Sequence, residues 1–151
     1  MWKTTMKLQA VILFLASTVY AARGSDIKDS ADEICMSKLN ISEKTFYSWF
    51  TEEYFVKNLN DPVIRTYMVC WMFEKGMTDK DGKVNDLKLV DWVRDEVFAF
   101  YKVPQPSRED KEKTAKKIVP ECIEKVGVRE KTNGKEVDLG DCLVRKTKAS
   151  L

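Results

Sequence analysis

The chain has 151 residues, with 26 lysine and arginine residues against 24 aspartate and glutamate residues, and it contains no histidine. This length is typical of one domain, and the balanced, interspersed charges argue against a nucleic acid partner, which requires clustered lysine and arginine. The absence of histidine removes the commonest general base, metal ligand and pH switch. The composition therefore argues against an enzyme, a metal site and a cofactor.

The N-terminal segment has the order of regions found in secretory signal peptides. A start with two lysines and no acid precedes an apolar run over residues 8–19, and small residues follow the run. The run is shorter than the about 20 apolar residues that cross a membrane, and a buried N-terminal helix is the alternative. We expect residues 1–21 to be a signal peptide cleaved after Ala21, or after Ala22 or Gly24, and the protein to be secreted and extracellular, without membrane insertion.

Three helices are predicted in the first half of the remaining chain. One covers residues 26–38, and Asn40 is a candidate cap for a second helix over residues 44–56. Asp61-Pro62 pairs a cap residue with a proline suited to the first helical position, so a third helix is predicted over residues 63–75, ended by a glycine. This helix is apolar on nearly every side, and we expect it to be the central element.

Further helices are predicted in the second half. One covers residues 86–101, and Ser107 caps another, in which Pro120 either kinks the helix or begins a second segment. Asn133-Gly134 predicts a turn, and a last short helix is expected over residues 138–148. No segment has the alternation of a strand.

Two short motifs concern possible modification and metal binding. Asp79-Lys80-Asp81-Gly82 predicts a turn rather than a calcium loop, because Met77 and Lys88 occupy the first and last loop positions, where carboxylates are needed. Asn40-Ile41-Ser42 is a glycosylation sequon whose occupancy the sequence leaves open. We expect no metal site.

Cysteine content indicates covalent crosslinks. The domain expected over residues 22–151 contains Cys35, Cys70, Cys122 and Cys142, and an even count in an exported chain predicts disulfides rather than metal ligation. Four cysteines allow three pairings, and spacing alone does not choose among them. Pairing neighbours in sequence closes modest loops, each stabilising by about 3 kcal/mol. No histidine is present to activate a catalytic thiol.

Several apolar residues of the predicted helices are candidates for a ligand site. Met68, Met72, Phe73, Met77 and Trp92 fit the core of a small helical domain, and taken alone a packed core is the favoured interpretation. The same residues also fit the wall of a cavity, because methionine is flexible and polarizable and suits promiscuous apolar sites. Periodicity cannot separate the two, since both put apolar side chains inside.

The segment from Thr66 to Met77, followed by Asp79-Lys80-Asp81-Gly82-Lys83-Val84, resembles the central signature of insect odorant-binding proteins. In that family a cysteine, an aromatic residue, two further residues and a second cysteine open the motif. A Glu-Lys pair, a glycine and an Asp-x-x-Gly turn follow. Here Thr66 replaces the first of those two cysteines. The resemblance covers most of the chain in layout, but only this central segment in specific residues.

The family's six cysteines pair first with third, second with fifth and fourth with sixth. With Thr66 in the second place and the fifth also absent, the resemblance implies the four-cysteine "minus-C" subclass, with pairs Cys35–Cys70 and Cys122–Cys142. This takes Cys142 as the sixth family cysteine. If it were the fifth, Cys122 would have lost its family partner.

The resemblance also implies an all-α fold, a compact bundle of about six helices around an apolar cavity with two disulfides. Its implied function is that of a secreted carrier, which reversibly binds small hydrophobic ligands such as odorants, pheromones or lipids, as a monomer or weak dimer with a receptor as a further partner. The resemblance implies that Met72, Phe73 and Met77, which follow the central cysteine, line the cavity. Inward-facing periodicity adds further lining candidates, which are Met68, Leu89, Trp92, Val93, Ile118, Ile123 and Leu143.

Two alternatives belong to other functional classes. One is a secreted helical protein whose surface binds a protein partner. The other is a scavenger of amines, which would need a carboxylate facing the pocket. Glu74, Asp91 and Asp95 are predicted to face outward. The residues do not indicate whether the tissue is antenna, haemolymph, reproductive secretion, venom or saliva.

Overall fold

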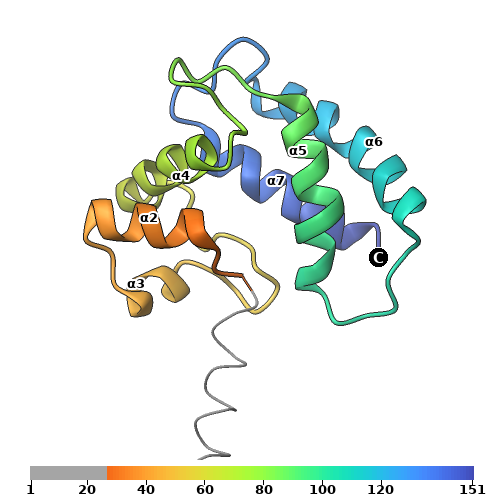
Figure 1. Ribbon diagram of the computed structural model, residues 1–151, viewed down its shortest axis with the longest axis horizontal. Coiled ribbons are helices and arrows are strands. Elements are labelled where there is room, and N and C mark those ends of the chain that lie inside the picture. Colours follow the sequence, from red (N-terminus) through yellow and green to blue (C-terminus); the bar gives the residue numbers. More distant parts are fainter. Residues whose placement is uncertain (1–26) are drawn as a thin grey trace, which may run out of the picture. The chain divides into compact units, whose positions relative to one another are not determined.

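The computed structural model describes residues 27–151, and its regular secondary structure is helical, apart from two isolated β-bridges (Figure 1). Residues 31–151 form one compact unit. The predicted all-α fold is confirmed, while the predicted signal peptide, residues 1–21, lies outside the described residues. The elements in chain order are α2 Ser30–Leu39, α3 Glu43–Ser48, α4 Pro62–Glu74, α5 Asp86–Trp92, the π-helical turn η1 Val93–Val97, the 3₁₀ turn η2 Phe98–Phe100, α6 Arg108–Val126 and α7 Glu136–Ala149.

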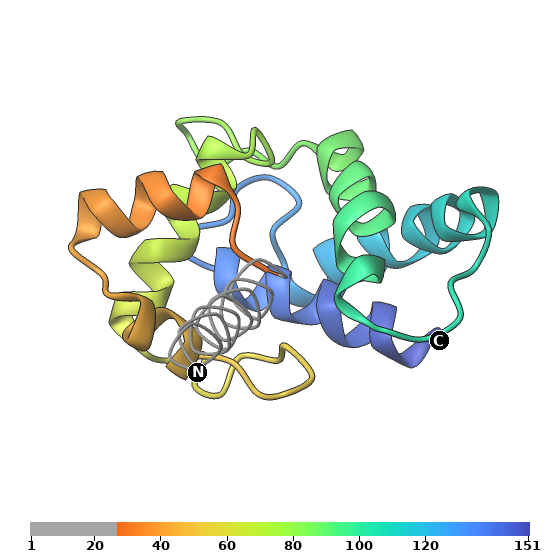
Figure 2. The same ribbon diagram turned by 60° about the horizontal axis from the view of Figure 1, so that its bottom comes forward.

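The C-terminal helix α7 is the central element of this unit. It contacts α4, η1 and α6, and Figure 2 shows it passing from the α4 side of the unit to the α5 and α6 side. Eight of its residues are buried, from Glu136 at its start to Thr147 near its end. The expectation that residues 63–75 form the central helix is wrong, because Val63, Val69 and Phe73 of α4 are 47%, 42% and 49% exposed.

Several predicted helix ends are confirmed. The Asp61 carboxylate accepts a hydrogen bond from the Val63 backbone N–H at 2.8 Å, with Pro62 at the first helical position. Ser107 likewise caps α6 by accepting from the Asp110 backbone N–H at 3.1 Å. The helix continues through Pro120 as a single element to Gly127, whose φ of +77° is the left-handed conformation that glycine adopts at a helix end.

The segment predicted as one helix over residues 44–56 forms only the short α3. Its cap is Ser42 rather than Asn40, which has a φ of +53°. After α3 the chain reverses, because the Thr51 hydroxyl accepts from the backbone N–H groups of Glu53 and Phe55. Threonine side chains compete with helical hydrogen bonds in this way, which ends the helix despite its helical spacing of aromatic residues.

Two disulfides crosslink the helices. Cys35–Cys70 joins α2 to α4, and Cys122–Cys142 joins α6 to α7, each with a Cα–Cα distance of 5.9 Å. The four cysteines are thus all paired, as predicted from the resemblance. The sequence separations of the two bridges are 35 and 20 residues.

Candidate ligand-binding site

Nearly all of the residues predicted to line a ligand site lie in the interior. They come from α4, α5, η1, α6, α7 and the turn after α4. The buried ones are Met68, Met72, Met77, Leu89, Trp92, Val93, Ile118, Ile123 and Leu143. Phe73 is different: it is 49% exposed and faces a surface groove. The interior group spans the contacts of α7 with α4 and α6.

Two methionines reach the backbone of α7. A Cβ atom built on Gly140 would lie 2.9 Å from Met68 Cε and 3.5 Å from Met72 Cε. Glycine at this position therefore lets the two thioether side chains pack directly on the helix. Methionine side chains are unbranched and adaptable, so they can repack around a ligand.

Two tryptophans pack next to each other between α4 and α5. The rings of Trp71 and Trp92 meet edge to face, with centroids 5.3 Å apart and an interplanar angle of 74°. Both indole Nε1 atoms are buried and have no hydrogen-bond partner in the described part of the chain. A buried donor without an acceptor costs about 1–3 kcal/mol, so this pair offers two N–H groups to an acceptor atom. Trp71 was not predicted as a site residue, although a tryptophan on a buried helix is always a potential donor.

A groove on the surface lies between α2, α4 and the turn after α4. It has a volume of about 410 Å³, and its lining includes Leu39, Val69 and Phe73. Thr66 also lines it and donates its hydroxyl to the Pro62 carbonyl at 3.0 Å. Glu136, the first residue of α7, also lines this groove, although it lies far from Thr66 in the sequence.

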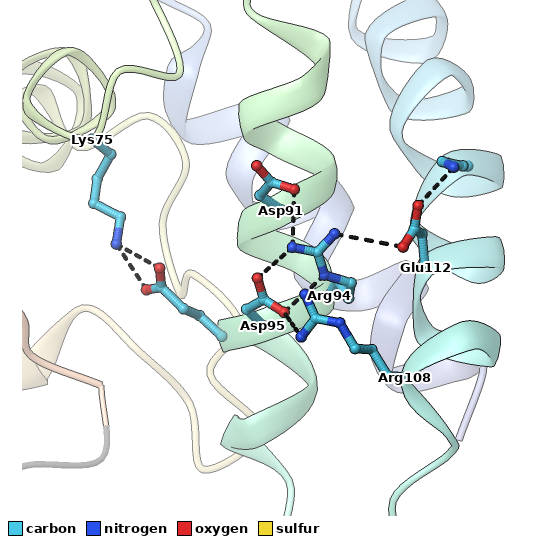
Figure 3. Close-up of polar contacts among 8 residues, drawn as sticks. Lys75, Asp91, Arg94, Asp95, Arg108 and Glu112 are labelled. Carbon is cyan, nitrogen blue, oxygen red and sulfur yellow. Dashed lines mark hydrogen bonds and ion pairs between the residues drawn. The ribbon is translucent and has the colours of Figure 1, made fainter.

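The acidic residues considered for amine binding are held by cations. Glu74 accepts from Lys38 at 2.8 Å, and Arg94 bonds both Asp91 and Asp95, as Figure 3 shows. The hydrogen bond from Arg94 lowers the pKa of Asp95, and the same bond raises the pKa of Arg94. Asp91 and Asp95 are 52% and 41% exposed and face outward, as predicted, whereas Glu74 is 22% exposed and lines the surface groove.

The same network joins the π-helical turn η1 to α6. Arg94 Nη1 lies 3.6 Å from Glu112 Oε2, and Arg108 at the start of α6 lies 3.2 Å from Asp95. A hydrogen bond from Lys116 lowers the pKa of Glu112. Figure 3 shows these side chains converging between the two helices. The network therefore has a structural role in fastening η1 against α6.

Metal binding and modification were also considered at the sequence level. Within residues 27–151 no cluster of cysteine and carboxylate side chains is arranged to hold a metal ion. The Asp79 carboxylate instead accepts from the backbone N–H groups of Lys83 at 2.9 Å and Asp81 at 2.8 Å, which lowers its pKa. Asn40 of the sequon is exposed. None of the helices in the described range has the length and apolar character to cross a membrane.

Neither a protein-family model, nor a curated protein, nor a solved structure matches this chain. The resemblance to odorant-binding proteins therefore rests on the residues of the central segment and stays a prediction.

Proposed function

We propose that this protein is a secreted carrier that reversibly binds small hydrophobic molecules, such as odorants, pheromones or lipids, in its interior. The observation that carries the proposal is the pair of buried, unpartnered indole N–H groups on Trp71 and Trp92. Helix α4, which carries Trp71, also carries the methionines Met68 and Met72 that pack on Gly140. Secretion is supported by the two disulfides, since such bonds persist in oxidising compartments.

Binding is driven by desolvation of the ligand. Moving about 200 Å² of apolar ligand surface out of water gives about 5 kcal/mol at ~25 cal/mol per Å². The methionines Met68 and Met72 adapt their conformations to make room. A carbonyl or ether oxygen on the ligand accepts a hydrogen bond from Trp71 or Trp92, which selects ligands with one acceptor over pure hydrocarbons.

The test is displacement of a fluorescent apolar probe, N-phenyl-1-naphthylamine, by matched ligands. We expect 2-decanone to bind at micromolar concentration and several-fold more tightly than decane. Replacing Trp71 or Trp92 with phenylalanine keeps a ring but removes the donor, so each should reduce this preference. Trp49→Phe is the control, because Trp49 packs in a separate cluster with Phe46 and Tyr67.

Two results would overturn the proposal. One is the absence of probe binding at micromolar protein concentration. The other is an unchanged preference for the ketone in both tryptophan variants, which would remove the indole groups from the site.

Because the chain has no histidine, the affinity for the apolar ligand should change less than tenfold between about pH 5 and 8.

A further inference from the structure

The carboxylate of Glu136 is buried, and one of its two oxygens has no hydrogen-bond partner in the described part of the chain. The residue is only 3% exposed, and its Oε1 accepts from the Thr132 hydroxyl at 2.5 Å. Its Oε2 has no partner within the described part of the chain, and none of the ion pairs found there includes it. Buried carboxylate oxygens are ordinarily paired or hydrogen-bonded. Glu136 therefore lacks a donor.

Packing holds this carboxylate in place. The Thr132 backbone N–H donates to the Gly82 carbonyl at 2.9 Å. Gly82 has a φ of +78°, and a Cβ atom built on it would lie 2.8 Å from Thr132 Oγ1. The turn at Gly82 therefore packs closely against Thr132, and the Thr132 hydroxyl donates to Glu136. A carboxylate fixed in this way is prepared for a ligand, because little side-chain freedom remains to be lost on binding.

The groove beside Glu136 suits a small molecule with an apolar body. Val69 and Phe73 of α4 give it apolar walls, although both are surface residues. Of the charged residues that line it, three are acidic and two are basic. They are Glu74, Asp79, Glu136, Lys38 and Lys80. Since Lys38 already bonds Glu74 at 2.8 Å, the surplus charge of the groove is negative.

We propose that this groove binds a small organic cation, an aliphatic or aryl-alkyl amine, independently of the interior site. The ammonium group donates to Glu136 Oε2, and the apolar part of the ligand packs on Val69 and Phe73. Charge-assisted hydrogen bonds of this kind are stronger than neutral ones. Because Oε2 has less than 1 Å² of exposed surface, the ligand reaches it by turning a side chain of the groove wall aside.

The test compares phenethylamine with phenethyl alcohol, which has the same apolar body without the charge, by isothermal titration calorimetry. We expect the amine to bind at least tenfold more tightly than the alcohol. Glu136→Gln keeps an oxygen acceptor for Thr132 but removes the charge, so it should weaken amine binding at least tenfold and change alcohol binding less than twofold. Glu74→Gln is the matched control, since Glu74 lines the same groove but already has a lysine partner.

A second measurement locates the ligand if the Glu136 variant does not fold. In the unsubstituted protein, phenethylamine should shift the NMR signals of the Thr132 and Gly82 backbone amides. Phe73→Ala should weaken the binding of both the amine and the alcohol. The proposal is overturned if millimolar phenethylamine does not bind, if Thr132 and Gly82 do not respond, or if Glu74→Gln weakens binding as much as Glu136→Gln. Displacement of the naphthylamine probe from the interior is a separate readout, so failure of one site does not imply failure of the other.

Discussion

Asp141 is the carboxylate whose removal should destabilise the protein most. It lies on the central helix α7 and is 6% exposed. One of its oxygens accepts from the Val56 backbone N–H at 2.8 Å, across 85 residues of sequence, and the other accepts from Arg145 at 2.6 Å. Arg145 also stacks on Phe55, 4.3 Å from the ring centroid. Asp141 therefore fastens the irregular segment after α3 to α7.

Two terms give the expected cost of Asp141→Ala. A hydrogen bond to a charged acceptor contributes about 1.5–3 kcal/mol, and the Val56 N–H would be left buried without a partner. The ion pair with Arg145, at spacing i and i+4 and half exposed, adds only about 0.3–0.5 kcal/mol. We expect Asp141→Ala to lower the free energy of unfolding by about 2–3.5 kcal/mol.

Urea denaturation followed by circular dichroism measures this difference at neutral pH. Asp141→Asn separates the two terms, because its amide oxygen still accepts from Val56 while the ion pair is lost, so it should cost under about 1 kcal/mol. Glu121→Ala removes an exposed carboxylate paired with Lys146 and should leave the free energy of unfolding nearly unchanged, because exposed ion pairs contribute little. Equal costs for the alanine and asparagine variants at Asp141, or a cost near zero for both, would refute the reasoning.

Four further outcomes are expected. Replacing both cysteines of Cys35–Cys70 with serine should lower the free energy of unfolding by about 3.8 kcal/mol, because this bridge closes a loop of 35 residues. The same replacement at Cys122–Cys142, which closes a loop of 20 residues, should lower it by about 3.3 kcal/mol. Calorimetric melting measures which variant is less stable. Burial raises the pKa of Tyr101 to about 12. The contribution of this tyrosine to stability is therefore present below about pH 10 and is lost as the pH rises through 12. In Tyr101→Phe, the free energy of unfolding should fall less steeply with pH over this range. Met72→Ala, at a side chain with no exposure, should cost about 2–5 kcal/mol in urea. Amides of α7 should exchange with solvent at least as slowly as those of α4; faster exchange in α7 would contradict its central position.

Local signals in the sequence were sufficient for most helix ends. Asp61 followed by Pro62 marks the start of α4, and Ser107 marks the start of α6, because each cap depends on residues within one turn. The disulfide pairs followed only from the resemblance, since spacing left three pairings open. Not every local feature could be predicted, since the reversal at Thr51 ends α3 early through hydrogen bonds that span only four residues.

The interior and the groove depend on contacts between distant segments, and there the sequence was less informative. The apolar pattern of α4 suggested burial on every side, but the helix lies at the surface and exposes Phe73. Glu136 was missed as a site residue, since its burial depends on Thr132 and the turn at Gly82 rather than on its neighbours. Trp71 was missed because pattern alone does not show that its N–H lacks an acceptor.

Thr66, which stands where the resemblance places a cysteine, is one of the residues that line the groove. By the resemblance, a crosslink from position 66 would tie α4 to the C-terminal region. In its place, α4 meets α7 through Arg65, 3.2 Å from Asp138, and through the methionine methyl groups on Gly140. Thr66 turns its hydroxyl to its own helix and lines the groove together with Glu136. Arg65 and the two methionines thus join α4 to α7 by noncovalent contacts alone, and Thr66 lies in the groove in which we propose that the amine binds.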